Sequence, residues 1–516
     1  MSTIPTASSM SESLLTRVAR MAKKYATFIG PGLVVSVSYM DPGNYLTSVS
    51  SGSMYQYKLC FIIFMANVFA IVLQSLCVKL GTITGLDLAE MCRLNLNPKL
   101  NLFMYFCAEI AIIATDLAEV VGTAIALEIL FGIPLLYGVL ITVLDVLIIL
   151  MAYRKDGTMK QTKFFEIIVS ILVAATCVCF IVELFKCDFA PGSGWQIFKG
   201  FLPVNKQIFQ ESMALFLSCG IVGLTVMPHS LYLGSALVQP RLKDYDEKHG
   251  TLKNDESSQA STISSNHHTR ELQPVEASRL RRISDGSLLA HKYKPSYAAI
   301  KYCLNYSYVE LVLSLFIVAV FVNSAILIVA GSTLYGKPDA ADADLLSIYE
   351  MLSYYISPAA GLVFALSMLF SGQSAGIVCT MAGQIVSEGF INWTIEPWKR
   401  RIATRVLAIL PVLIVVGALG REGVSKVMNS SQVVLSFILP IVSAPLIYFT
   451  SKKEYMTVVD TSSTDESSYL LAEAPQQKTI SFENGTFLRI ASILTWVIIT
   501  ALNIYLVIAF ANGADI

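Results

Sequence analysis

Residues 27–50 of this 516-residue chain read TFIGPGLVVSVSYMDPGNYLTSVS, an apolar run that is long enough to cross a bilayer. Asp41-Pro42-Gly43-Asn44 interrupts this run. Pro42 lacks an N–H and its ring clashes with the preceding turn, so Pro42 and Gly43 predict a break in the helix. A carboxylate at membrane depth costs roughly 2.5–3.5 kcal/mol on insertion scales and by default indicates a functional site.

The interrupted segment also predicts ligands for a cation. Backbone carbonyls that a helix break sets free are tolerated at membrane depth only where they line a protein or water cavity. Together with the side chains of Asp41 and Asn44, such carbonyls form a set of hard oxygen ligands. The alternative is a proline-kinked helix in which neighbouring groups satisfy a buried Asp41.

Composition places the whole chain in a membrane. The chain is 54% hydrophobic and 14% charged, with a mean hydropathy of +0.62, whereas a soluble protein carries about 25% charged residues. The net charge is zero and we expect no nucleic-acid partner. The ten cysteines have neither zinc-ligand nor disulfide spacing and are interpreted as small buried hydrophobes. We see no nucleophile–base constellation or phosphate loop, so an enzyme is not expected.

Eleven apolar runs of about 20 residues predict an all-α polytopic membrane protein. They begin near residues 27, 57, 102, 131, 163, 207, 299, 346, 399, 425 and 486. Basic residues concentrate in the even-numbered connections and just before the first span, which predicts a cytosolic N-terminus and a C-terminus outside the cell or in a lumen. The basic residues before the first span are Arg17, Arg20, Lys23 and Lys24.

These spans divide the chain into two halves and several connections. We predict a cytosolic tail (1–26), a first five-helix repeat (27–186), an extracytosolic loop (187–206), a second five-helix repeat (207–449), a cytosolic loop (450–485) and an eleventh helix with the C-terminus (486–516). Residues 241–296, inside the second repeat, are polar and are predicted to be a disordered cytosolic loop. That loop contains Arg279–Ser284, which is either a basophilic kinase site or an unregulated solvated segment.

Residues 466–471 match the pattern of a membrane-sorting signal. Glu466-Ser467-Ser468-Tyr469-Leu470-Leu471 has an acidic residue at dileucine spacing, a pattern that sorting adaptors bind. This pattern favours an endomembrane such as the vacuole, and the plasma membrane is the alternative.

A second proline interrupts the sixth span at Met227-Pro228-His229. Each of the two five-helix halves begins with one of the broken helices. Paired breaks at matching positions indicate an inverted-repeat transporter whose site lies near the midplane. Met227 supplies a thioether, a soft ligand that suits transition metals better than Ca²⁺ or Mg²⁺. A site of Asp41, Asn44, Met227 and carbonyls therefore favours Mn²⁺ or Fe²⁺, and these ligands do not rank the two ions.

The two interrupted motifs resemble those of the Nramp family of proton-coupled divalent metal transporters. The resemblance extends over most of the hydrophobic part of the chain and includes Gly30–Gly32, Gly85–Glu90, Ser235–Gln239, Ser371–Ser374 and Met381–Val386. It implies a LeuT-like fold of five plus five helices and an eleventh, with helices one and six broken. It also implies that the metal is bound by Asp41, Asn44, Met227, the carbonyls of Ser38 and Leu224, and Gln432.

The chain departs from the family pattern at two positions. Leu224 stands where a small alanine is usual, which predicts a narrower pocket. Gly234 stands where the sixth span usually carries a second histidine, so a proton route that needs two histidines is not expected here.

Three acids in the third span predict a proton path. Glu109, Asp116 and Glu119 are seven and three residues apart, and a helix turns about 100° per residue, so they share one stripe. Arg405 in the ninth span is the expected counter-charge. His229 is interpreted either as a proton carrier or as a neutral gating residue. A polar cluster that merely joins helices is the alternative, and Glu183, near a span end, is interpreted as interfacial.

The predicted function is proton-coupled symport of Mn²⁺ or Fe²⁺ into the cytosol by alternating access. Two alternatives remain at this point: a metal sensor without turnover, and a LeuT-like amino-acid transporter. Asp41 at the break would repel an amino-acid carboxylate, and a sensor needs no proton path. We expect a monomer in the lipid bilayer that needs no cofactor beyond its transported ions.

Overall fold

The computed structural model describes residues 30–142, 159–250, 293–337, 340, 343–391, 397–460 and 478–511. Among these residues, eight helices are long and apolar enough to cross a membrane. Three further predicted spans complete the set of eleven. The first span is broken into two short helices, part of the predicted fourth span falls on residues 143–158, which are outside the described part, and the ninth contributes the apolar segment Ile409–Ala418.

The first half contains six helices that the structure defines completely. They are α2 (Pro31–Val37), α3 (Pro42–Tyr55), α4 (Cys60–Thr84), α5 (Leu88–Asn95), α6 (Pro98–Phe131) and α8 (Met159–Lys186). The short α5 begins with a capping box, in which the Glu90 N–H donates to Asp87 Oδ1 and the Asp87 N–H donates to Glu90 Oε2, both at 2.9 Å. The two acidic residues of the 85–90 motif therefore start a helix.

The second half is built from more pieces. They are α9 (Ser193–Gly200), α10 (Gln207–Gln210), α11 (Ser212–Thr225), α12 (Pro228–Ala236), α13 (Gln239–Lys248), α16 (Tyr297–Ser314), a π-helical turn (Leu315–Ala319), α17 (Val320–Thr333), α18 (Leu345–Tyr355), α19 (Pro358–Ile391) and α20 (Pro397–Ser451). The strands β1 (Thr457–Asp460) and β2 (Lys478–Ser481) and the helix α21 (Thr486–Ala511) follow. Gly420, at φ 62° and ψ −154°, separates the ninth and tenth spans inside α20.

Both broken helices stop and restart at the predicted prolines. Pro42 is the first residue of α3, and the side chain of Asp41 caps this helix by accepting a hydrogen bond from the Asn44 N–H. Pro228 is the first residue of α12, after an extended Met227. Gly122 of α6 packs directly on Pro42, because a Cβ atom at Gly122 would lie 2.2 Å from Pro42 Cβ.

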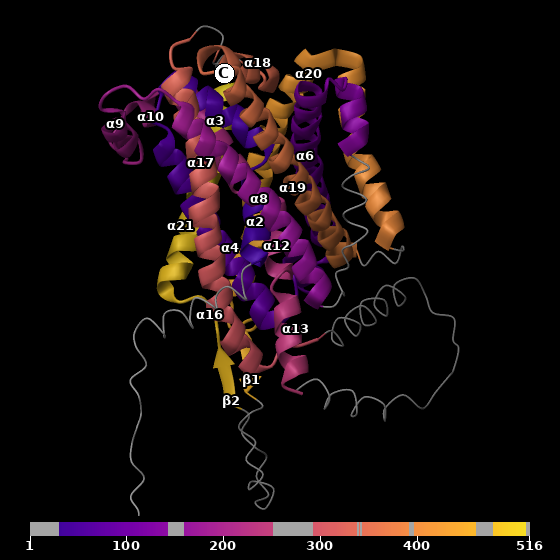
Figure 1. The fold of residues 1–516 in the computed structure, drawn as a ribbon. Helices are drawn as coiled ribbons and strands as arrows, with labels where there is room; N and C mark the ends of the chain where they lie inside the picture. The colour runs from indigo at the N-terminus through magenta and orange to yellow at the C-terminus, as the bar shows by residue number, and fades with distance from the viewer. Residues whose placement is uncertain are drawn as a thin grey trace, which may run out of the picture.

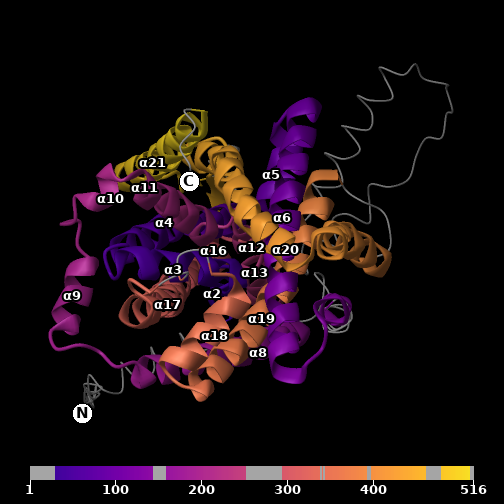
Figure 2. The same ribbon diagram turned by 90° about the horizontal axis from the view of Figure 1, so that it is seen from above.

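The pieces of the broken helices lie in the interior of the bundle. Seen from above, α2, α3 and α12 lie inside a set of helices that includes α6, α8, α19, α20 and α21 (Figure 2). Nearly every residue of these three short helices is buried, polar ones included. The polar atoms that the two breaks set free therefore face protein and not lipid.

The connections divide between the two ends of the bundle as the alternating topology requires. Figure 1 shows α9, α10 and α18 at the upper end, with α13 and the two strands at the lower end. The basic loops predict that the lower end faces the cytosol. The chain ends at the upper end, where α21 finishes.

Two predictions about these connections were wrong. The eighth span does not begin near residue 346, because residues 345–355 form the separate helix α18 and the span is α19, from Pro358. The loop 241–296 is not disordered at its start, because α13 continues to Lys248. Asp246, buried in α13, accepts hydrogen bonds from Ser296 and from the Tyr293 hydroxyl, and burial together with this carboxylate raises the pKa of Tyr293. Residues 251–292, with Arg279–Ser284, lie outside the described part.

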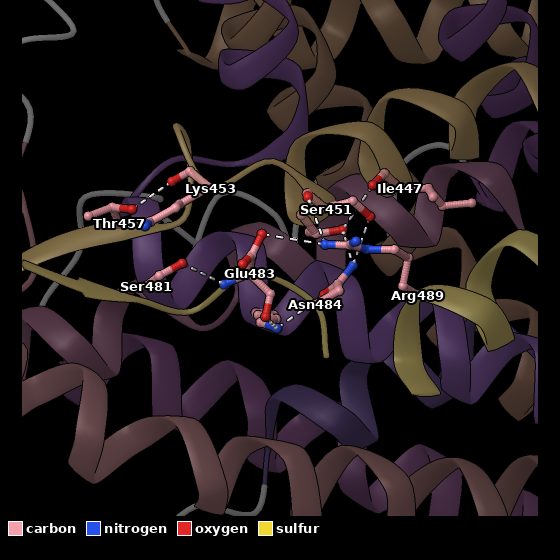
Figure 3. Close-up of polar contacts among 10 residues, drawn as sticks. Ile447, Ser451, Lys453, Thr457, Ser481, Glu483, Asn484 and Arg489 are labelled. Atoms are coloured by element: carbon pink, nitrogen blue, oxygen red, sulfur yellow. Dashed lines mark hydrogen bonds and ion pairs between the residues drawn. The ribbon is translucent and has the colours of Figure 1, made fainter. Parts of the chain in front are cut away.

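The loop 450–485, predicted to be cytosolic, contains a hairpin that was not predicted. Strands β1 and β2 pair antiparallel, with Thr457 opposite Ser481. Figure 3 shows Asn484 and Arg489 beside the end of α20, where the Asn484 amide donates to Ser451 Oγ at 3.3 Å. Lys79 of α4 donates to the Asn484 side chain at 3.1 Å, so the loop is attached to the second span as well. The dileucine segment, residues 466–471, is not among the described residues.

Candidate metal-transport site

The first break presents oxygen atoms that lack partners. Asp41 is 1% exposed, and its Oδ1 accepts from Asn44 Nδ2 at 2.5 Å and from the Asn44 N–H at 3.3 Å. Asp41 Oδ2, Ser38 Oγ and Asn323 Oδ1 are buried and have no hydrogen-bond partner among the described residues. A buried oxygen acceptor without a donor is costly, and a cation is the kind of group that oxygen atoms of this type bind.

The Tyr39 carbonyl fixes the shape of this break. Asn323 Nδ2 of α17 donates to that carbonyl at 2.8 Å, and Asn44 Nδ2 donates to it at 3.3 Å. The break is therefore held open by side-chain amides from two different helices. The sequence analysis did not single out Asn323, although an amide inside an apolar span is itself an indication of a polar interior.

The two prolines account for the predicted carbonyl ligands. In an α-helix the carbonyl of a residue accepts from the N–H four residues later. For Ser38 that residue is Pro42, and for Leu224 it is Pro228, and neither proline has an N–H. The carbonyls of Ser38 and Leu224 consequently lack this intrahelical donor. A carbonyl must lack it if its oxygen is to bind a metal ion as predicted.

The two breaks face each other across the interior. The hydroxyl of Tyr39, in the first break, lies 3.1 Å from Ser230 Oγ, just after the second break. A side chain at Gly43 would lie 3.0 Å from Asp41 Oδ2 and 3.4 Å from Leu224 Cδ2. The side chains of Leu224 and Asp41 therefore both lie close to Gly43, as expected if the leucine narrows the pocket.

Met227 and His229 share one neighbour at the second break. Both are fully buried, and Thr115 Oγ1 of α6 lies 3.8 Å from Met227 Sδ and 3.4 Å from His229 Nδ1. His229 Nε2 has no hydrogen-bond partner in the described structure. Thr115 was missed in the sequence analysis, although it directly precedes Asp116 of the acidic stripe.

Gln432 lies at the same site but is engaged by protein groups. Its Oε1 accepts from Thr47 Oγ1 at 2.7 Å, and its Nε2 donates to the Gly43 carbonyl at 3.5 Å. Gln432 thus joins α20 to α3 one turn beyond Asn44. In this conformation it supports the first break through Thr47 and Gly43.

The three predicted acids are all buried along α6. The exposed fraction falls from 9% at Glu109 through 3% at Asp116 to 1% at Glu119, so Glu109 is the most accessible. Ligand atoms of Asp116, Glu119 and Cys379 lie within 4.8 Å of one another, which brings a thiol from α19 to the stripe. The backbone of Arg405 belongs to α20, and its side chain lies outside the described part, so its pairing remains a prediction.

Two layers of polar contacts lie toward the end of the bundle that is predicted to face the cytosol. Gln74 Nε2 of α4 donates to the Tyr39 hydroxyl at 3.0 Å and to Ser230 Oγ at 2.9 Å. Nearer the cytosol, the N–H groups of Gly30 and Gly32 both donate to the carboxylate of Glu310.

A buried ion pair adjoins this second layer. Arg241 of α13 binds Glu166 of α8 through two bonds, of 2.9 and 3.1 Å, and both side chains are buried. Bidentate arginine–carboxylate pairs combine strength with fixed geometry. Elements from both halves of the chain thus hold the start of α2 in place.

Gln74 occupies the space that a larger residue at position 234 would need. A Cβ atom at Gly234 would lie 2.1 Å from Gln74 Oε1. The glycine that replaces the expected histidine therefore lets the Gln74 amide reach Tyr39 and Ser230. Gln74 was not predicted, although an amide in an apolar span indicates a polar interior, as at Asn323.

This geometry defines a class of protein: a polytopic membrane transporter of the LeuT-like fold, with helices one and six broken around a central site. A family model described as natural resistance-associated macrophage protein-like, Nramp, matches residues 32–472. The chain belongs to the Nramp family.

Named relatives and solved structures agree with this family. The chain is 54% identical to the iron transporter SMF3 of Saccharomyces cerevisiae, over 96% of this chain and 98% of the relative. It is 46% identical to the manganese transporter SMF1 of the same yeast, over 94% of this chain and 85% of the relative. A crystal structure of a mutant Eremococcus coleocola manganese transporter has a TM-score of 0.72 at 28% identity, covering 100% of this chain and 92% of that one.

Proposed function

We propose that the protein is a proton-coupled symporter that moves Mn²⁺, Fe²⁺ or both into the cytosol by alternating access. The observation that carries the proposal is the pair of facing helix breaks, with the unpartnered Asp41 Oδ2 on one side and Met227 on the other. The family and the relatives named as iron and manganese transporters support the same cargo.

In this proposal the metal binds between the two breaks. Asp41 Oδ2, Asn44 Oδ1 and the carbonyls of Ser38 and Leu224 are the hard ligands, and Met227 Sδ is the soft one. The soft ligand favours transition metals over the more abundant Ca²⁺ and Mg²⁺. Gln432 is a further member of the set.

The proton follows a separate route from the metal. A proton that leaves Asp41 as the metal binds passes by His229 to Glu119 and Asp116, and exits toward the cytosol at Glu109. Two facts support this order: the rise in exposure toward Glu109, and the bond that links His229 to Thr115, next to Asp116. Arg405 is the proposed counter-charge for the inner acids.

We further propose that the protein acts in an endomembrane such as the vacuole, where it would release stored metal to the cytosol. The acidic dileucine segment and the cytosolic loops support this location. Replacement of Leu470 and Leu471 by alanine should move a fluorescently tagged protein to another membrane, whereas an unchanged distribution would reject the signal.

The direct test of the function is metal uptake into proteoliposomes that contain a pH-sensitive dye, for the wild type and for Asp41→Ala. We expect saturable Mn²⁺ entry with acidification of the lumen, and the loss of both in the variant. Mn²⁺ entry without acidification would reject symport but keep the metal site. Metal binding without entry would identify a sensor.

A further inference from the structure

Glu183 is a buried carboxyl group that the proposed transport route does not use. It lies in the last turn of α8, toward the extracytosolic end, and is 1% exposed. Its Oε1 has no hydrogen-bond partner among the described residues. Glu183 lies near the end of its span, as predicted from the sequence, but it is buried in protein. An acid buried without a counter-charge is retained at a cost, which calls for an explanation.

Glu183 lines a small cavity where five elements meet. The cavity has a volume of about 10 Å³, close to the minimum that one water molecule needs. Every other lining residue is apolar: Val49 of α3, Phe180 of α8, Ile326, Val329 and Ala330 of α17 with Leu334 after it, Leu352 of α18, and Phe364 of α19. The carboxyl group thus lies between α8 and α19 on one side and α3 and α17 on the other, with α18 above.

No described basic side chain pairs with this carboxyl group. The titratable groups that face it are the hydroxyl of Tyr45 from α3 and the thiols of Cys179 and Cys187, one turn away in each direction along the chain. Asp188 lies next to Cys187. The residues that α17, α18 and α19 contribute to the cavity do not titrate.

The cavity is separated from the metal site by an aromatic layer. Tyr45, four residues after Asp41, packs on Phe180 at 5.4 Å and on Phe364 at 5.8 Å between ring centroids. The Tyr45 hydroxyl donates to the Ser367 carbonyl of α19 at 3.2 Å. The helix that begins at Asp41 is therefore packed against α8 and α19 at the level of Glu183, and any movement that opens this layer exposes Glu183 to water.

We propose that Glu183 is a second proton-binding site, on the extracytosolic side, that controls closure of the protein over its cargo. The inference rests on alternating access, as in the proposed function. Closing the junction of α3, α8, α17, α18 and α19 (the seam) around an ionised Glu183 would bury an unpaired carboxylate, and the loss of its hydration opposes closure. Closure consequently requires a proton from the extracytosolic side, and an acidic lumen favours it. Opening admits water, and an exposed glutamate ionises above a pH of about 4.3.

The test compares four proteins: the wild type, Glu183→Gln, Glu183→Asp and the control Glu350→Gln, which removes an exposed carboxylate from α18. Glutamine preserves the shape and neutral state of the protonated side chain, and aspartate keeps a titratable group. Hydrogen exchange of α18, corrected for the intrinsic effect of pH, reports opening of the seam without any need for transport. Mn²⁺ uptake at varied extracytosolic pH and fixed cytosolic pH is measured beside it.

One proton taken up on closure changes the closing equilibrium by about tenfold per pH unit. For the wild type, the aspartate variant and the control, we expect the protection of α18 from hydrogen exchange to fall this steeply as the pH rises. Glu183→Gln should stay protected at every pH while the ratio of protons to Mn²⁺ is unchanged. A wild-type pH profile in Glu183→Gln would overturn the proposal, as would a changed proton ratio. Absence of Mn²⁺ uptake in the wild type would reject the proposed function instead, and the exchange experiment would still decide the role of Glu183.

Discussion

In the proposed function Asp41 has two tasks, and each of its carboxylate oxygens performs one of them. Oδ1 accepts from Asn44 and so starts the helix α3, whereas Oδ2 is left without a protein partner. A residue that both builds the break and binds the cargo cannot be replaced without loss of both. Met227 is different, because it has no part in capping α12. The two ligands should therefore respond differently to substitution.

Met227→Ala should keep part of the Mn²⁺ transport and lose selectivity. The oxygen ligands remain, but the thioether that disfavours Ca²⁺ is gone. A change of about 1.4 kcal/mol in relative binding would let Ca²⁺ compete at about tenfold lower concentration. Inhibition of Mn²⁺ uptake by Ca²⁺ measures this effect, and equal Ca²⁺ exclusion in variant and wild type would contradict it.

Gly234→Ala should act through Gln74. The new methyl group would meet the Gln74 side chain and displace its amide from Tyr39 and Ser230. Each lost bond costs about 0.5–1.5 kcal/mol. The double variant with Gln74→Ala should then be hardly worse than Gln74→Ala alone, because residues in one network are not additive. Rates of Mn²⁺ uptake in the four proteins test this, and strictly additive losses would refute the mechanism.

The residues of the site were predictable to different degrees. Asp41, Asn44 and Met227 stand out in the sequence, because a proline beside a polar or soft ligand inside an apolar span is rare. Thr115, Gln74 and Asn323 are polar residues inside apolar spans, which indicates a polar interior but not the groups that each side chain contacts. Their roles depend on which helices meet, and this is decided by tertiary packing.

At the scale of elements, α2 is a short helix held at both ends. Its first N–H groups donate to Glu310 of α16, where a carboxylate suits the positive end of a helix. Arg241 and Glu166 pair beside it. The start of α2 is therefore bonded to parts of the second half that belong to other spans.

Arg241→Met should destabilise the protein more than the double variant Arg241→Met/Glu166→Gln. The single change leaves the carboxylate of Glu166 buried without its partner, which typically costs about 3–5 kcal/mol. Thermal unfolding in detergent measures the difference. Lys248→Met serves as the control, since its exposed pair with Asp244 should contribute at most about 1 kcal/mol. A single variant as stable as the double one would contradict this account.

The spans were easier to predict from the sequence than the connections. Apolar runs predicted the long helices because membrane burial imposes both composition and length on them. Helix α18 was merged with α19 because Leu345–Tyr355 is nearly as apolar as a span. Helix α13 and the β1–β2 hairpin are polar, and they form because buried groups such as Leu242 and Met456 pack on the bundle, which local composition does not reveal.

At the scale of the whole molecule, the connections give the bundle two chemically different ends. The upper end carries α9, α10 and α18, and the lower end carries α13 and the hairpin (Figure 1). The basic loops join the lower end, which predicts that this end faces the cytosol.

Epitope tags inserted after Gly192 and after Gly250 should be accessible from opposite sides of the membrane. Both glycines lie in turns where an added side chain would meet nothing within 4 Å, so both insertions should be tolerated. Antibody binding to intact and permeabilised membranes measures the sidedness, and we expect the tag at Gly250 on the cytosolic face. Two tags on the same face would contradict the predicted topology.

The contact between Gly122 and Pro42 has a consequence for genetics. Every missense change of a glycine codon adds at least one carbon atom, and at position 122 that atom would overlap the proline at which α3 begins. No allele with an amino-acid change there should be silent, whereas changes to small apolar residues at Gly417, where an added side chain meets nothing within 4 Å, should be tolerated. In a random mutagenesis screen for loss of metal uptake, alleles should therefore accumulate at a codon whose residue carries no chemistry of its own.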